Sequence, residues 1–255
     1  MCGRYASSRD AGELAEEFDV AELHIDEPRP ADWNVAPTKE VYAVLERPAK
    51  DDRPQQRQLR TLRWGLVPSW AKDRSIGNRM INARMESVAE KPAYRKAFAS
   101  RRCLLPADGY YEWYATEQRT KAGKAVKQPF FIRPRDGGVL AMAGLYEIWR
   151  DPTKPDDDPH PFLWSCTVIT TDAPDDLGRI HDRMPLMVER GRWAEWLDPT
   201  ASGSLDLLVP AAPGRLEAYP VSTRVNSVDN NGSDLVEPLP VEGPEAAVSD
   251  EQGSR

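Results

Sequence analysis

The chain contains 255 residues, of which 40% are hydrophobic and 29% are charged. This composition is typical of a globular protein that buries a sizeable core in one large domain or two small ones. No apolar run reaches the length of a membrane span, and the N-terminus lacks the charged and then apolar layout of a signal peptide. We therefore expect a cytoplasmic protein.

The chain has three cysteines and three histidines. The cysteines are too few and too scattered for a disulfide framework or a CxxC metal site. We therefore predict reduced thiols in a reducing compartment, no metal and no cofactor.

The net charge of −7 argues against a simple polyanion binder, but the charge is unevenly distributed. Residues 57–103 contain twelve Lys or Arg and three acidic residues, so this basic block carries +9. Trp64, Trp70, Tyr94 and Phe98 are interleaved with the basic side chains. Such a pattern is typical of a nucleic-acid surface with stacking rings. A solvated basic face that balances acidic ones is an equal alternative from these residues alone.

Short strands dominate the predicted elements. A helix is expected over 8–18, with Ser8 or Asp10 as its cap, and another over 92–99, with Pro92 in its first turn. Further helical turns are expected at 173–180 and 190–197. Strands are expected at 41–45, 59–67, 103–105, 110–114, 130–133, 139–149, 164–171 and 186–188. Many short strands with few helices predict an α+β fold, with a mainly antiparallel, barrel-like β-sheet and peripheral short helices.

The chain shows no break in composition that would divide its body. We therefore predict a single domain over residues 1–234. Residues 235–255 are rich in Pro and acidic residues and predict a disordered tail. An acidic, Pro-broken excursion is expected at 150–161.

The first residues, Met1-Cys2-Gly3-Arg4-Tyr5, are chemically distinctive. Removal of Met1 would expose Cys2 as a 1,2-aminothiol, whose amine and thiol have reference pKa values of about 7.7–8.0 and about 8.5. Together these groups can close a five-membered ring on an aldehyde. Position alone favours the alternative that Cys2 is a small apolar filler, since free cysteine is usually buried and inert.

Two carboxylates and one histidine are candidate proton-transfer groups. Glu112 lies in an aromatic strand and shares a face with Tyr110 and Tyr114, an apolar setting that raises a carboxyl pKa and suits a proton donor. An outward-pointing carboxylate is the alternative, because the pattern does not say which face is buried. Glu147 is a similar candidate. His181 can titrate near neutrality, although a lone histidine is more often structural.

Six segments are rich in reactive or conformationally special residues, and together they resemble one family. The motifs, in order, are MCGR, NVAP, WGL-P-W, NAR-E, RCL-PA-G-YEW, AGLYE-W, TT-A and HDRMP, and they run from Cys2 to about Val225-Asn226. Eight motifs in order are specific where one would be weak. On these residues the chain is identified as a member of the SOS response-associated peptidase (SRAP) family, which binds single-stranded DNA and covalently traps abasic sites.

The resemblance implies roles residue by residue. Cys2 matches the nucleophile that acts after Met1 is removed, and Asn82 matches the asparagine held close to it. Glu112 and His181 match the acidic residue and the histidine of the site. Residues that fall where the family contacts DNA are Arg4, Trp64, Trp70, Arg79 and Arg84. The departures, Trp33 before NVAP and Met85 within NAR-E, fall on none of these positions.

The resemblance also implies the reaction. The amine of Cys2 would attack the aldehyde of an abasic site to give a Schiff base, and the thiol would close it to a thiazolidine, a stable DNA–protein link. Weak lyase activity and a peptidase activity of Cys2 are implied as well. We expect a monomer whose partner is single-stranded DNA containing abasic sites, associated with the nucleoid when DNA is damaged. The alternatives are an N-terminal-nucleophile cysteine peptidase or amidohydrolase and a non-catalytic single-strand-binding module.

Overall fold

The computed structural model describes residues 2–49, 55–173, 175–201, 205–210 and 214–240. Within them, short helices surround two sheets, where the sequence predicted peripheral short helices around one barrel-like sheet. The strands are β1 (Tyr5–Ser7), β2 (Glu22–His24), β3 (Asp32–Val35), β4 (Glu40–Arg47), β5 (Gln56–Trp64), β6 (Asn82–Arg84), β7 (Arg102–Ala107), β8 (Gly109–Arg119), β9 (Ala125–Pro134), β10 (Leu140–Arg150), β11 (Phe162–Asp172), β12 (Arg183–Pro185) and β13 (Leu216–Pro220).

The helices are short and several are of the 3-10 type. The α-helices are α1 (Ala11–Glu17), α2 (Arg95–Ser100), α3 (Asp175–Gly178) and α4 (Trp193–Leu197). The 3-10 helices are η1 (Arg74–Arg79), η2 (Met85–Ser87), η3 (Arg190–Arg192), η4 (Leu205–Leu207), η5 (Thr223–Asn226) and η6 (Ser233–Val236). No helix in the described ranges is long and apolar enough to cross a membrane.

The larger sheet closes into a barrel. Its path runs β12-β11-β10-β7-β4-β5-β2, and an additional parallel pairing joins β11 to β5. The strands β5, β4, β7, β10 and β11 therefore form a closed ring, which we call the barrel. The mainly antiparallel, barrel-like sheet predicted from the sequence is confirmed.

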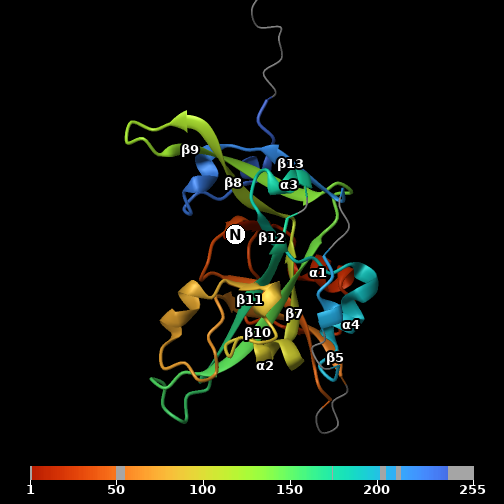
Figure 1. Cartoon of the computed structure of the whole chain (residues 1–255). Helices are drawn as coiled ribbons and strands as arrows, with labels where there is room; N and C mark the ends of the chain where they lie inside the picture. Colours follow the sequence, from red (N-terminus) through yellow and green to blue (C-terminus); the bar gives the residue numbers. More distant parts are fainter. Residues whose placement is uncertain (1, 50–54, 174, 202–204, 211–213, 241–255) are drawn as a thin grey trace, which may run out of the picture.

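The second sheet has the order β13-β9-β8-β1-β3 and is antiparallel throughout. We call it the upper sheet because Figure 1 shows it above the barrel, with β12 between the two. Helices α1 and α4 lie at one side of the barrel and α2 below it (Figure 1). The N-terminal strand β1 therefore enters the upper sheet at a position that faces the barrel.

Four apolar clusters of described residues fill this arrangement, and the three larger ones position the site. One includes Trp64, Cys103 and Cys166 and extends from the barrel strands to Cys2 and Tyr5. A second packs α1, α2 and α4 against the outside of the barrel, and a third lies behind the upper sheet. The third contains Leu235, which is fully buried. Leu239 N also donates to Pro220 O at 2.9 Å. The predicted start of the disordered tail at residue 235 is therefore too early. Residues 241–255 lie outside the described residues.

Two predicted elements are displaced along the sequence. Helix α2 begins at Arg95, so Pro92 precedes it in a turn, and the expected strand at 186–188 is observed instead as β12 at Arg183–Pro185. Leu186 nevertheless continues the pairing, because its amide donates to Ile169 O at 2.8 Å and its carbonyl accepts from Ala143 at 2.7 Å. The predicted Asp10 cap of α1 is confirmed and forms a capping box with Glu13.

Arg102 is a buried structural centre of the fold. Its side chain is 2% exposed, and its guanidinium donates to five backbone carbonyls at 2.6–3.1 Å. These carbonyls lie at and just beyond the C-terminal ends of α2 and α4 and belong to Phe98, Ala99, Trp196, Asp198 and Ala201. Carbonyls at helix C-termini have no intrahelical partner, and a cation is favourable there. One side chain therefore holds both helices against β7.

We expect Arg102→Leu to destabilise the protein by about 4 kcal/mol or more, because it leaves several buried carbonyls without donors. The melting temperature should fall by roughly 10 °C or more. Arg95→Leu, at an exposed position of α2, is the matched control and should change stability by less than about 0.5 kcal/mol. Chemical denaturation of the two variants measures this directly. An equal, small effect in both would contradict the structural role of Arg102.

Candidate active site

The candidate site is built around Cys2, which is fully buried at the start of the described chain. Its backbone carbonyl accepts a hydrogen bond from Asn82 Nδ2 at 2.8 Å. The two residues are 80 positions apart in sequence, so only the fold brings them together. The predicted proximity of Asn82 to Cys2 is therefore observed.

Asn82 is held by strand pairing and by a neighbouring helix. It begins β6, which runs parallel to β11 with Asn82 opposite Val168. Its carbonyl accepts from the hydroxyl of Tyr94 at 3.3 Å. Because its backbone is fixed from both sides, its side-chain amide is aimed at the N-terminal segment by rigid elements rather than by a loop.

Glu112 is brought to the same place by the upper sheet. Tyr5 pairs with Tyr110, and Tyr111 N donates to Arg4 O at 2.9 Å. Extending this antiparallel register by one residue places Glu112 opposite Gly3, next to Cys2. Glu112 is 3% exposed. The structure thus decides between the two interpretations of this strand, because the carboxyl group points inward.

Burial governs the electrostatics of the pair. Desolvation raises the pKa of Glu112 above its ordinary value, while the nearby His181 acts to lower it. Burial is also the main cause that raises the pKa of the Cys2 thiol, and the charge of Glu112 adds to it. Both shifts favour the protonated forms, a neutral thiol at Cys2 and a carboxylic acid at Glu112.

His181 lies between α3 and β12 and is half-buried. Its Nδ1 lies 3.0 Å from Arg183 N and 2.9 Å from Asp182 Oδ1. One nitrogen cannot accept from the amide and donate to the carboxylate at once. We favour the amide contact, because Asp182 is 88% exposed and surface ion pairs are weak. In that tautomer the ring presents a protonated Nε2 as a donor.

Arg183 joins the histidine segment to the asparagine segment. Its Nη1 lies 2.6 Å from Glu86 Oε1 and 2.6 Å from Asp172 Oδ1, and its Nη2 donates to Thr170 O at 2.6 Å. Glu86 follows β6, and Arg183 begins β12. This contact was not predicted from the sequence. The available signal was that Glu86 lies in the NAR-E motif and Arg183 in the HDRMP motif.

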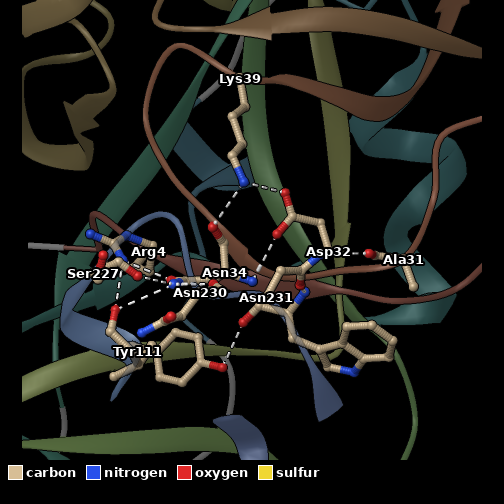
Figure 2. Close-up of polar contacts among 11 residues, drawn as sticks. Arg4, Ala31, Asp32, Asn34, Lys39, Tyr111, Ser227, Asn230 and Asn231 are labelled. Atoms are coloured by element: carbon tan, nitrogen blue, oxygen red, sulfur yellow. Dashed lines mark hydrogen bonds and ion pairs between the residues drawn. The ribbon is translucent and has the colours of Figure 1, made fainter. Parts of the chain in front are cut away.

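A buried polar network fixes the N-terminal segment from the other side (Figure 2). Arg4 Nη1 donates to Asn34 Oδ1 at 2.7 Å and to Val225 O at 2.9 Å. Asn34 is fully buried, and its Nδ2 donates to Ser227 O at 2.8 Å and Asn230 O at 2.9 Å. The NVAP segment therefore connects Arg4 to the C-terminal part of the described chain, a role that sequence reasoning missed.

Arg4 was predicted to contact DNA, but its observed partners are internal. Besides Asn34 and Val225 it lies 5.8 Å from the centroid of the Trp113 ring, and burial lowers its pKa. A phosphate contact of Arg4 stays a prediction. The structure itself shows a residue that anchors the segment next to Cys2.

The prediction that Trp64 stacks on a DNA base is wrong in this structure. Its ring is fully buried, its Nε1 donates to Ile81 O at 2.9 Å, and it packs edge-on against Tyr5 with 5.2 Å between ring centroids. Neither ring face is open to a base. Trp70, by contrast, is 60% exposed, and Arg79 and Arg84 are exposed as well, so their DNA contacts stay predictions.

Glu147, the other candidate acid, is already engaged. Arg101 Nη2 lies 2.9 Å from Glu147 Oε2, and Ile148 N donates to Glu147 Oε1 at 3.0 Å. Both carboxylate oxygens of Glu147 are thus occupied by donors of the protein itself. Among the described residues, no group of three His, Cys, Asp or Glu side chains is placed to hold a metal ion.

Known proteins resemble this chain over almost its whole length. A family model described as "SOS response associated peptidase (SRAP)" matches residues 1–228. Abasic site processing protein YoaM of Bacillus subtilis is 38% identical over 240 residues, which cover 93% of this chain and 98% of that protein. Abasic site processing protein YedK of Escherichia coli is 31% identical over 248 residues, which cover 94% and 100%.

Solved structures share the fold. A crystal structure of a protein from Bacteroides thetaiotaomicron has a TM-score of 0.73 at 22% identity and covers 93% of this chain and 100% of its own. Another, from Bordetella bronchiseptica, has a TM-score of 0.65 at 25% identity and covers 87% and 100%. With the family model spanning most of the chain and the relatives matching it end to end, the chain belongs to the SOS response-associated peptidase (SRAP) family.

Proposed function

We propose that this protein is an abasic-site sensor that binds single-stranded DNA and forms a covalent thiazolidine link through Cys2 after Met1 is removed. The observation that carries the proposal is the hydrogen bond from Asn82 Nδ2 to the carbonyl of Cys2, at 2.8 Å. It supports a role in which the N-terminus itself is held for reaction. Relatives across nearly the whole chain are named abasic site processing proteins.

The first step is release of the aldehyde. An abasic deoxyribose is mostly a closed hemiacetal, so its ring oxygen must gain a proton when the ring opens, while its anomeric hydroxyl loses one. A buried Glu112 with a raised pKa can give the first proton and regain the second. The Nε2 of His181 can assist at the sugar hydroxyl and later at the imine.

The second step joins the aldehyde to the aminothiol. The Cys2 amine adds to the aldehyde carbon, and loss of one water gives a Schiff base. The Cys2 sulfur then adds to the imine carbon, and its proton passes to the imine nitrogen. The raised pKa of the Cys2 thiol suits this order, because the sulfur must deliver a proton as it closes the ring.

The raised pKa of the Cys2 thiol also ranks the alternative activities. A cysteine peptidase attacks with a thiolate, and burial raises the pKa of Cys2 rather than lowering it. A peptidase activity is therefore second, at most as cleavage after Met1 or release of the protein. A weak lyase activity would follow from the Schiff base, which can undergo β-elimination before the sulfur closes it.

DNA contact is proposed for the exposed part of the basic block. Trp70 offers an exposed ring, and Arg79 and Arg84 offer exposed cations on either side of Asn82. Stacking is worth about 1–3 kcal/mol per base and is sequence-independent. We propose that the protein acts as a monomer on the nucleoid of cells with damaged DNA.

The test is to mix the Met1-processed protein with single-stranded DNA that contains one abasic site. We expect an adduct that survives heating and migrates as protein plus DNA on a denaturing gel. A form that keeps a residue ahead of Cys2 should give none, because its α-amine is no longer on the thiol-bearing residue. Equal adduct from both forms would contradict the proposal, and peptide turnover without any adduct would favour the hydrolase.

Asn82→Ala should slow adduct formation roughly 10- to 100-fold, because the N-terminus is no longer held in its reacting position. Asn82→Asp should lose about as much, since a carboxylate has no N–H to donate to Cys2 O. Single-turnover adduct formation measures both. Asn78→Ala, at an exposed position of η1, serves as the control. Wild-type rates in both Asn82 variants would show that the contact is not used.

A further inference from the structure

A cleft of about 1000 Å³ lies between the upper sheet and the barrel and is not used by the mechanism above. One wall comes from β8, β9 and β13, and the other from β10, β12 and the ends of α3 and α4. Its volume lies at the upper end of the range found for binding sites of small ligands. Residues that line it and matter below are Tyr114, Phe130, Arg135, Arg179, Ile180 and Met184.

The cleft borders the candidate active site, because residues next to Glu112 and His181 line it. Phe130 is the direct cross-strand partner of Glu112, and Tyr114 lies two residues further along the same face of β8. On the opposite wall, Ile180 immediately precedes His181. A DNA strand whose abasic sugar sits between Glu112 and His181 therefore has one of its two flanking segments directed toward the cleft.

The interior of the cleft suits flat, weakly polar groups. Phe130, Ile180 and Met184 form apolar surface that would not hold a phosphate. Tyr114 is 41% exposed and meets Phe130 edge-on, with 6.4 Å between centroids and 81° between planes. An edge-on contact leaves a face of the Tyr114 ring free to stack on a base.

The charges at the rim suit phosphates. Three carboxylates of the lining are each paired with an arginine: Glu17 with Arg190 at 3.0 Å, Glu189 with Arg215 at 3.3 Å, and Glu217 with Arg133 at 2.8 Å. Arg135 and Arg179 have no carboxylate partner in the part of the chain that the structure describes. Asp136 Oδ1 accepts from Gly138 N at 2.9 Å. The lining as a whole holds four arginines and four acidic residues, and Arg135 and Arg179 are its arginines without a carboxylate partner among the described residues.

We propose that this cleft binds nucleotides on one side of the abasic site, with Tyr114 stacking on a base and Arg179 contacting a phosphate. The proposal rests on the proposed function, because it takes the abasic sugar at Glu112 as its starting point. In this proposal the DNA strand leaves the basic block and follows the upper sheet. The proposal also predicts that affinity depends on strand length on one side of the abasic site only.

The test uses the full chain carrying Cys2→Ala and fluorescein-labelled oligonucleotides that hold a tetrahydrofuran abasic analogue. The oligonucleotides extend four nucleotides on the 5′ side, the 3′ side or both. We expect extension on one side to tighten binding in fluorescence anisotropy. Tyr114→Ala should weaken binding of the oligonucleotide extended on that side at least fivefold. It should leave the affinity for the oligonucleotide extended on the other side unchanged. Arg179→Gln should reduce the slope of log affinity against log salt by about 0.7.

Phe162→Ala is the matched control, since Phe162 is 54% exposed and lies outside the cleft, and it should bind as the parent does. The proposal is overturned if Tyr114→Ala and Arg179→Gln both bind one-sided extensions like the parent, or if Tyr114→Ala weakens both sides equally. Neither the analogue, which has no aldehyde, nor the Cys2→Ala protein can form a thiazolidine. A failure of the proposed crosslinking chemistry would therefore leave this measurement intact.

Discussion

Replacing Cys2 with alanine should abolish the heat-stable adduct. The variant keeps an N-terminal amine and can still form a Schiff base, but it has no sulfur to close the ring. Adduct should therefore appear only when borohydride is added to reduce the imine. A denaturing gel of reactions with and without borohydride measures both outcomes.

Cys166→Ala is the matched control for Cys2→Ala, because Cys166 is also fully buried in the same apolar cluster. It should form the heat-stable adduct at the wild-type yield. Persistence of that adduct in Cys2→Ala without borohydride would mean that another nucleophile reacts. The assignment of Cys2 would then be wrong.

Glu112→Gln should slow adduct formation by roughly 10²- to 10⁴-fold, the usual contribution of a positioned general acid. The glutamine keeps the size and burial of the side chain but has no acidic proton to give to the sugar. Glu117→Gln, on the exposed outer part of the same strand, is the control. Single-turnover rates of the two variants distinguish the loss of the acid from a general effect of a substitution in β8. Wild-type rates in Glu112→Gln would contradict the proposed proton donor.

The pH dependence follows from the direction of the Glu112 shift. Its protonated form is needed, so the rate should fall as pH rises through a pKa that burial has raised above 4.5. The amine must be neutral, with a reference pKa of about 7.7–8.0, so the rate should also fall at low pH. The profile should be bell-shaped, and Glu112→Gln should lose its descending alkaline limb.

The same shift has a consequence for stability. Because the folded-state pKa of Glu112 is raised, the native protein holds this proton more tightly than the unfolded chain. The contribution is fully present below the ordinary pKa and is lost as pH rises through the folded pKa. Glu112→Gln should therefore be more stable than wild type at pH 7, and the difference should disappear in acid. Urea denaturation at both pH values measures it.

The residues that make up the candidate site were largely predictable from the sequence. Cys2, Asn82 and Glu112 were singled out from motifs, and the structure brings them together. Their juxtaposition depends on the pairing of β1 with β8 and of β6 with β11, which no local pattern specifies. Strand alternation also left open whether Glu112 points inward, since a shift of one residue exchanges the two faces.

The basic block shows where sequence reasoning was insufficient. Trp64 and Arg102 belong to a stretch that has the composition of a nucleic-acid surface, yet both are buried. Closure of the barrel between β5 and β11 encloses Trp64, and the two helix ends enclose Arg102. Composition alone does not reveal this burial, because it depends on pairing between strands about a hundred residues apart in the sequence.

The network around Asn34 was missed for a similar reason. In the sequence, NVAP is a short loop motif between prolines. In the structure, Asn34 binds Arg4 on one side and the carbonyls of Ser227 and Asn230 on the other. The buried amide satisfies carbonyls from a segment about 190 residues away, a function that becomes visible only when all three segments are folded together.

The central claim is that the reactive unit is the aminothiol rather than the amine or the thiol alone, and Cys2→Ser tests it most directly. Serine keeps the amine and an oxygen at the position of the sulfur, so the Schiff base can form but no thiazolidine can. We predict that Cys2→Ser gives no heat-stable adduct with abasic single-stranded DNA unless borohydride is present. A heat-stable adduct from Cys2→Ser at the wild-type yield without borohydride would contradict the account.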